Sequence, residues 1–274
     1  MFKNLTEWHY PKTIDEALLL LKKGEVVPHA GGTALLRVKS NRIRGLVDLK
    51  QLPINSKKED EQFFFLGAGV KLAQIACWDR LTGAASILKQ GASKIASTPL
   101  RNRITIGGSI AAPPPWSDMP PVLLALNAQI EVTGTAAGIY SAEQYFQKNP
   151  LDGTSLITEV KIPKLPGNAV FKRVTQTKFD YSMLDLAIYL SLQKEVIDEI
   201  RVAIGCAVSR AIRLKEVEKF LLKKKPSETL FKEAAQAADF KPLEDRRVSK
   251  EYRQELLKIL LQRGLAEIIQ SSKI

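Results

Sequence analysis

The hydrophobic and polar positions at the start of the chain follow the pattern of a small α/β unit. Thr13 and Glu16 have capping-box spacing, in which the threonine hydroxyl accepts from the N–H three residues on and the glutamate carboxylate reaches back. The apolar stripe behind them predicts a helix, and Gly24 can end it in the left-handed conformation. Apolar runs at residues 26–30 and 47–49 then predict two short buried strands.

The pattern changes after a polar segment at residues 55–61, which we interpret as a boundary or a hairpin turn. Strands are expected at residues 63–69, 104–106, 129–132 and 156–162, and helices at residues 72–76 and 84–95. This part of the chain therefore predicts an α+β unit around a mixed sheet.

A second boundary is predicted at residues 163–167, where two prolines and a glycine disfavour both helix and sheet interior. Beyond it, strands are expected at residues 170–174 and 201–205, and helices at residues 183–192, 213–223, 230–238 and 250–269. The predicted fold class is α+β, in three units at residues 1–55, 56–165 and 166–274.

Charge is the one global property that adds to this picture. The chain has 274 residues, 45% of them hydrophobic, and a formal net charge of +12. Such a balance favours nucleic acid, an acidic partner or an anionic cofactor, but no recognition-helix, RNP or zinc-finger pattern accompanies it, so we expect no nucleic-acid binding. Arg37, Lys39, Arg42 and Arg44 form a local basic cluster, which we interpret as a solvated face or a docking surface for an acidic subunit.

The shortage of cysteine and histidine limits the chemistry. Cys77 and Cys206 are expected to be buried, and they provide neither a disulfide framework nor a cysteine-ligated metal cluster. His9 and His29 are too few for a zinc site or a Ser-His-Asp triad, so no metal site and no catalytic side chain are predicted. With no signal-peptide core and no run near the roughly 20 apolar residues of a membrane span, we expect a cytoplasmic protein.

Two glycine-rich turns, at residues 30–33 and 105–109, carry the candidate binding chemistry. Each Gly-Gly pair lets backbone N–H groups approach a ligand with no side chain in the way, and each follows an apolar stretch that predicts a strand. Two such turns can hold one extended diphosphate. A single turn of this kind is more often an ordinary strand-to-helix connection, so the hypothesis depends on both turns occurring together with Asp118.

Three segments resemble the FAD-binding medium subunit of molybdenum hydroxylases, the family of the carbon monoxide dehydrogenase medium subunits and the bacterial xanthine dehydrogenase FAD-binding subunits. They are residues 30–36, 101–111 and 115–126, and residues 245–247 and 251–253 are similar to the C-terminal domain of the same flavoproteins. The resemblance implies a two-subdomain FAD-binding fold of the vanillyl-alcohol oxidase (PCMH) type, followed by a C-terminal α+β domain of the CO dehydrogenase flavoprotein type.

The resemblance also implies a non-covalent FAD between the first and second units. Backbone N–H groups of both turns, including that of Gly108, are expected to bind the diphosphate. The hydroxyls of Thr105 and Ser109 are expected near the cofactor, Asp118 at its sugar or adenine end, and Tyr181 over its ring. The expected cofactor-binding residues are Pro28, His29, Ala30, Gly31, Gly32, Thr33, Ala34, Leu35, Ile95, Thr105, Gly107, Gly108, Ser109, Asp118, Ile157 and Tyr181.

Several of these residues also have a purely structural interpretation. Thr105 could pair on a strand, and Asp118 could cap the helix that follows it. Trp116 and Tyr181 could be packing or interface residues. His29 precedes the first turn, which favours a packed strand histidine over a covalent flavin anchor.

The function implied by the resemblance is electron transfer. A molybdopterin-binding large subunit would oxidise the substrate, a small [2Fe-2S] subunit would relay single electrons, and the FAD of this chain would pass them to NAD⁺ or another acceptor. Molybdopterin and [2Fe-2S] are therefore expected only on partner subunits, in a hetero-oligomer, with a homodimer as the alternative for the isolated chain. Two further alternatives are an independent FAD-dependent reductase or oxidase of the same fold, and a flavin-free basic binding protein.

Overall fold

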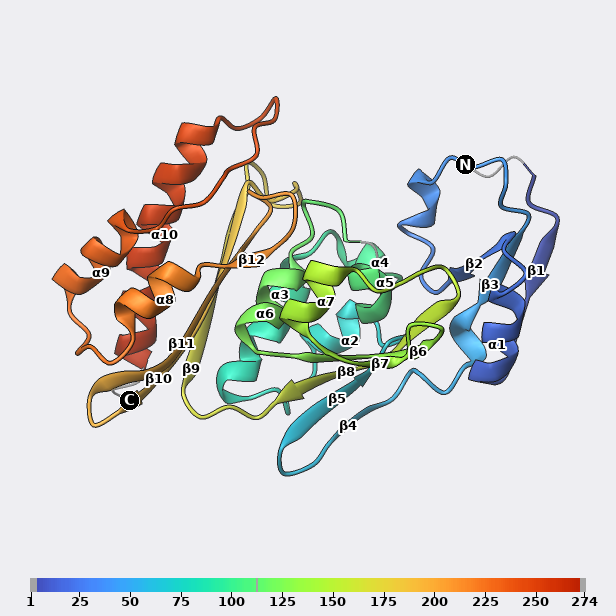
Figure 1. The fold of residues 1–274 in the computed structure, drawn as a ribbon, viewed down its shortest axis with the longest axis horizontal. Coiled ribbons are helices and arrows are strands. Elements are labelled where there is room, and N and C mark those ends of the chain that lie inside the picture. The colour runs from blue at the N-terminus through green and yellow to red at the C-terminus, as the bar shows by residue number, and fades with distance from the viewer. Residues whose placement is uncertain (1–3, 112, 272–274) are drawn as a thin grey trace.

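Three β-sheets, each with its own helices, follow one another along the chain and lie side by side in Figure 1. This computed structural model describes residues 4–111 and 113–271. We name the three parts the first, second and third units, and the residues at which one unit passes into the next stay a prediction. None of the described helices is both long and apolar enough to cross a membrane.

The first unit is a three-stranded parallel sheet with β3 in its centre. Its elements are β1 (Glu7–His9), α1 (Ile14–Leu21), β2 (Val26–His29), η1 (Leu35–Arg37), β3 (Gly45–Asp48) and η2 (Leu49–Gln51). The predicted capping box forms at the start of α1, where Thr13 Oγ1 accepts from the Glu16 N–H at 3.2 Å. Gly24 has φ +81°, the left-handed conformation expected where this helix ends.

The second unit packs its helices against a five-stranded antiparallel sheet of order β4-β5-β8-β6-β7. Its strands are β4 (Lys57–Glu59), β5 (Phe63–Gly67), β6 (Gln129–Gly134), β7 (Gly138–Ser141) and β8 (Ser155–Pro163). Its helices are α2 (Leu72–Ala76), η3 (Gly83–Ala85), α3 (Ser86–Lys94), α4 (Thr98–Arg101), α5 (Ile106–Ala111), α6 (Met119–Ala125) and α7 (Ala142–Lys148).

Three predictions for the second unit need correction. The mixed sheet is wrong, because every pair of neighbouring strands in this sheet runs antiparallel. The strand expected at residues 104–106 is wrong, because Thr105 makes only an isolated bridge to Lys71 and the chain enters α5 at Ile106. Cys77 is exposed rather than buried, because it follows the last residue of the short helix α2; Cys206 is buried as expected.

The third unit is a four-stranded antiparallel sheet of order β12-β11-β10-β9, covered by three helices. Its elements are β9 (Asn168–Val174), β10 (Leu184–Gln193), β11 (Val196–Gly205), β12 (Ile212–Arg213), α8 (Lys215–Leu221), α9 (Glu228–Gln236) and α10 (Lys250–Ser271). The helix predicted at residues 183–192 is wrong, since this segment is β10. Both faces of β10 are buried, so the run lacks the alternation that marks a half-exposed strand.

The sheet of the third unit separates two hydrophobic cores. Phe171 and Tyr189 point from it into the core that also holds α3 and α6 of the second unit. Their neighbours Val170 and Ile188 point into a second core, against the helices of the third unit. The two units are therefore packed through a shared sheet face rather than joined by a linker alone (Figure 1).

Candidate cofactor site

A cavity of about 320 Å³ lies between the first and second units, and both glycine turns line it. Its size is at the lower end of the roughly 300–1,000 Å³ typical of ligand pockets. The predicted site residues found in the lining are Pro28, Ala30, Gly31, Gly32, Thr33, Ala34, Leu35, Thr105, Gly107, Gly108 and Ile157. Two segments far apart in sequence thus meet at one place, as the paired motifs predict.

The first turn begins where β2 ends and passes close to the second turn. A Cβ on Gly31 would lie 1.9 Å from the carbonyl oxygen of Arg103, so only glycine allows the two backbones to approach this closely. Gly32 has φ +75°, the left-handed conformation. Within residues 4–111 and 113–271, the N–H groups of Gly31, Gly32 and Thr33 donate no hydrogen bond, which leaves them free for the oxygens of a ligand.

The second turn uses its backbone N–H groups internally. Thr105 Oγ1 accepts from the Gly108 N–H at 3.0 Å, and the Gly107 N–H donates to the carbonyl oxygen of Ala68 at 2.9 Å. The expectation that the Gly108 N–H binds a diphosphate therefore does not match this structure, in which it belongs to the cap of α5. Ser109 lies outside the lining, where its hydroxyl donates to the carbonyl oxygen of Ile106 at 2.7 Å.

Apart from backbone groups and three hydroxyls, the described residues that line the cavity are apolar, and they carry no charge. Among the residues that the structure describes, no ionisable side chain lines the cavity, and its side-chain hydroxyls are those of Thr33, Thr105 and Ser155. Sequence reasoning missed the lining residues Val27, Leu49, Ile54, Ala68, Ile104, Ala111, Leu151, Gly153, Ser155 and Leu156. Most are ordinary apolar residues near strand ends, and no motif distinguishes them from core residues.

His29 and Ile95 lie outside the lining. The ring of His29 packs edge-on against Trp8, with 5.3 Å between centroids, and its Nδ1 lies 3.5 Å from Asp48 Oδ2. A Cβ on Gly32 would come within 2.7 Å of His29 Nε2, so this ring supports the first turn from behind. Ile95 offers its carbonyl oxygen to Arg101 Nη1 at 3.0 Å. The interpretation of His29 as a packed strand histidine agrees with this placement.

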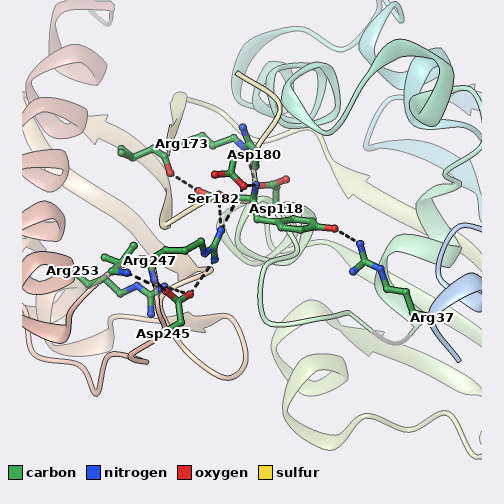
Figure 2. Close-up of polar contacts among 11 residues, drawn as sticks. Arg37, Asp118, Arg173, Asp180, Ser182, Asp245, Arg247 and Arg253 are labelled. Carbon is green, nitrogen blue, oxygen red and sulfur yellow. Dashed lines mark hydrogen bonds and ion pairs between the residues drawn. The ribbon is translucent and has the colours of Figure 1, made fainter. Parts of the chain in front are cut away.

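Asp118 also lies outside the lining, in a buried ion pair with the third unit. Its Oδ1 accepts from Arg173 Nε at 3.0 Å, and each side chain is only 7% exposed. Although Asp118 directly precedes α6, its side chain makes no capping hydrogen bond. The structural alternative of a helix cap is therefore wrong, and the carboxylate instead ties the second unit to β9 (Figure 2).

Asp185 and Cys206 complete a buried cluster with Asp118. Burial, followed by the nearby charge of Asp118, raises the pKa of the Asp185 carboxyl well above its ordinary value, which favours the neutral form of this group. Burial also raises the pKa of the Cys206 thiol, which lies 3.0 Å from Asp185 Oδ2 and donates to it. Arg173 supplies the positive charge beside this cluster through its ion pair with Asp118.

Tyr181 reaches from the third unit to the first. Its hydroxyl accepts from Arg37 Nη2, and the guanidinium carbon of Arg37 lies 5.4 Å from the ring centroids of both Tyr181 and Trp116. The backbone at Tyr181 is held by the third unit, because Arg247 Nη1 donates to its carbonyl oxygen at 3.3 Å. In Figure 2, Arg37 approaches this network from the side opposite Arg253.

We name Arg37, Trp116 and Tyr181 the cation–π cluster. None of the three lines the cavity, but Arg37 follows the lining residue Leu35 by two positions, so the cluster lies beside the cavity. Trp116 and Tyr181 are 5.3 Å apart between ring centroids, which supports the interpretation of both as packing or interface residues.

Comparisons with known proteins agree with this architecture. The model described as "FAD binding domain in molybdopterin dehydrogenase" matches residues 2–165, and that of the "CO dehydrogenase flavoprotein C-terminal domain" matches residues 169–268. The chain belongs to the FAD-binding subunits of the molybdenum hydroxylases. These matches confirm the family predicted from the sequence, the α+β fold and FAD as the cofactor of this flavoprotein.

Individual relatives resemble this flavoprotein over most of its length. The glyceraldehyde dehydrogenase medium chain of Sulfolobus acidocaldarius is 30% identical, over 94% of this chain and 96% of the relative. The carbon monoxide dehydrogenase medium chain of Afipia carboxidovorans is 29% identical, over 68% and 69%. The structure of quinoline 2-oxidoreductase from Pseudomonas putida 86 superposes with a TM-score of 0.91 over 100% of both chains, at 24% identity, and shows the shared fold.

Proposed function

We propose that this flavoprotein is the electron-transfer subunit of a molybdenum hydroxylase-type complex. It would take electrons from a [2Fe-2S] subunit and pass them to NAD⁺ or another acceptor. The observation that supports this most strongly is the cavity that both glycine turns line, at the contact of the first and second units. FAD supplies the redox chemistry when bound, and the chain holds and surrounds it.

Within this proposal, the two sides of the cavity have different roles. The free N–H groups of Gly31, Gly32 and Thr33 bind the diphosphate, because charge-assisted hydrogen bonds suit phosphate oxygens. The apolar side chains of Leu49 and Ile157 exclude water from the rest of the cofactor. The other predicted contacts, those of Pro28, Ala30, Ala34, Leu35, Thr105, Gly107 and Gly108, are proposed because these residues also line the cavity.

Five predicted contacts lie outside the cavity lining, those of His29, Ile95, Ser109, Asp118 and Tyr181, and the last three would each have to give up a present partner to reach the cofactor. Asp118 would need to exchange Arg173 for a ribose hydroxyl to bind the nucleotide, and Ser109 would need to release the carbonyl oxygen of Ile106. Tyr181 would cover the ring only by moving from its contact with Arg37.

The composition of the lining favours electron transfer over an independent reductase or oxidase. Such an enzyme needs groups that move protons on its own substrate, and these are usually ionisable side chains. Among the described residues, the polar groups of the lining are the three side-chain hydroxyls and backbone N–H and C=O groups. A flavin in this cavity would exchange electrons with partners while the protein moves no proton through a side chain.

The partners follow from the names of the relatives, which are medium chains and medium subunits. From these names we infer that the partners of this chain are a large molybdopterin-binding subunit and a small [2Fe-2S] subunit. Both are proteins that this chain would contact in a hetero-oligomer.

Anaerobic flavin reduction tests the proposal. The purified full chain is saturated with FAD, desalted, and mixed with the dithionite-reduced [2Fe-2S] subunit of the same complex while flavin absorbance is followed. We expect retained flavin that is reduced only when the iron–sulfur subunit is present, and reoxidised by NAD⁺ or another acceptor. Loss of all flavin on desalting would refute the site, and catalytic reduction by an organic substrate without any partner would favour the independent enzyme.

A further inference from the structure

A short segment that runs from within η1 to the start of β3 has an unusual surface. We name residues 36–44 the basic loop, because this stretch contains four cationic side chains and no acidic one. Arg37, Lys39, Arg42 and Arg44 are all exposed. The loop also carries Leu36, which is 70% exposed, the largest value among the exposed large hydrophobic side chains of the described residues.

The charges of the basic loop are poorly balanced within the chain. Arg44 lies 3.5 Å from Glu25, and Arg37 is used in the cation–π cluster. Within the described part of the chain, the side chains of Lys39 and Arg42 form no ion pair or hydrogen bond. Like charges at this spacing repel one another, and an anionic partner would relieve that repulsion.

The position of the loop connects it to the cavity. Leu35 lines the cavity, and the basic loop begins with the next residue. Arg37 then contacts Tyr181, so the loop lies where the first unit meets the third. A protein that delivers electrons to a cofactor in this cavity must approach close to it, and the basic loop is part of the exposed surface there.

We propose that the basic loop is the docking surface for an acidic face of the [2Fe-2S] subunit. This inference rests on the proposed function. The four cations would steer the approach of carboxylates, and Leu36 would enter an apolar depression among them. An exposed leucine among cations fits a protein surface better than the phosphates of NAD⁺, which offer it no apolar contact.

Charge reversal within the loop tests the docking surface. The variant Arg42→Glu reverses the charge of an exposed side chain that pairs with no group in the described part of the chain, and the control Lys232→Glu reverses a charge on the exposed face of α9, in the third unit. Association of each full-length protein with the purified [2Fe-2S] subunit is measured at low and high salt. We expect Arg42→Glu to slow association about tenfold at low salt and to weaken its salt dependence, while Lys232→Glu associates like the wild type.

A second measurement locates the contact directly. Carbodiimide treatment of the assembled complex is expected to join the Lys39 amine to an aspartate or glutamate of the [2Fe-2S] subunit, identified by mass spectrometry. Flavin content after desalting should be equal in all variants, so a failure of docking can be told apart from a failure of the FAD site.

Three results would overturn the inference. Equal association of Arg42→Glu and wild type would exclude the loop from the contact. An unchanged association with a raised KM for NAD⁺ would assign the loop to the electron acceptor. Binding of the wild type, but not of Arg42→Glu, to phosphatidylglycerol vesicles, without any effect on the [2Fe-2S] subunit, would assign the loop to a membrane surface.

Discussion

Replacing Gly31 by alanine tests whether the contact between the two glycine turns forms the FAD site. The new Cβ would lie 1.9 Å from the carbonyl oxygen of Arg103, whereas ordinary contacts begin at 3.4 Å. The Arg103 backbone must therefore retreat by about 1.5 Å, the difference between these distances. The obstacle is main chain, so no side-chain rotation can relieve it.

The expected size of the effect follows from this displacement. Forcing extra atoms into a packed contact costs about 1–3 kcal/mol. If the protein keeps its fold and the turns separate, restoring the binding geometry costs this energy when FAD binds, and the dissociation constant for FAD rises by about 5- to 150-fold. The dissociation constant is measured by titrating flavin fluorescence of the apoprotein, and urea unfolding without FAD measures the loss of stability separately.

Gly83→Ala is the matched control. Gly83 has φ +56°, but among the described residues other than Gly83 and its two chain neighbours no heavy atom lies within 4 Å of the added Cβ, and Gly83 lies outside the cavity lining. It should lose about 1–2 kcal/mol of stability from backbone strain and bind FAD like the wild type. Unchanged affinity in Gly31→Ala, or an equal loss of affinity in Gly83→Ala, would refute the argument that the close approach of the turns shapes the site.

Three further changes address the groups around the site. Arg173→Met leaves the buried Asp118 carboxylate without its partner and should lower the free energy of unfolding in urea by about 3–5 kcal/mol; a loss below about 1 kcal/mol would contradict this. The Asp185 carboxyl keeps its proton in the folded protein at pH values above its ordinary pKa of 3.8, because its folded pKa is raised. Its contribution to the free energy of unfolding should therefore be complete below pH 3.8. As pH rises from there toward the folded pKa, the free energy of unfolding should fall by about 1.4 kcal/mol per pH unit. Asp185→Asn should remove this slope in urea titrations over pH, and an identical slope in the variant would assign it to other groups. Thr105→Val removes the acceptor for the Gly108 N–H and should destabilise the protein to urea by about 1 kcal/mol, whereas Thr105→Ser should not, and equal losses would exclude the hydroxyl.

Local signals in the sequence were sufficient for much of the fold. The Thr13 capping box and the left-handed Gly24 depend on interactions within a few residues, and both form as predicted. The helix predicted at residues 183–192 is wrong for the opposite reason, because the structure of this segment depends on interactions far along the chain. Their pattern depends on burial by α6 on one face and α10 on the other, and a strand covered on both faces has the same continuous apolar run as a buried helix.

The candidate site shows the same division. The first turn could be placed because it occurs together with the second turn, and within the described residues its N–H groups donate no hydrogen bond. The Gly108 N–H could not be assigned from sequence, because the competition between a ligand and Thr105 depends on where α5 begins. The partner of Asp118 was also hidden, since Arg173 is 55 positions further along the chain and only the packing of β9 brings it near.

The sheet with a core on each face has a consequence for how the chain can be divided. Removing everything after residue 165 would take away the surface on which α3 and α6 rest, and would expose the side of the second unit that Phe171 and Tyr189 now cover. A C-terminal fragment would expose the complementary face. Neither piece should be handled as a separate module: swapping the C-terminal portion between relatives would also exchange half of a core, and such chimeras should succeed only when the residues of that shared face are exchanged together.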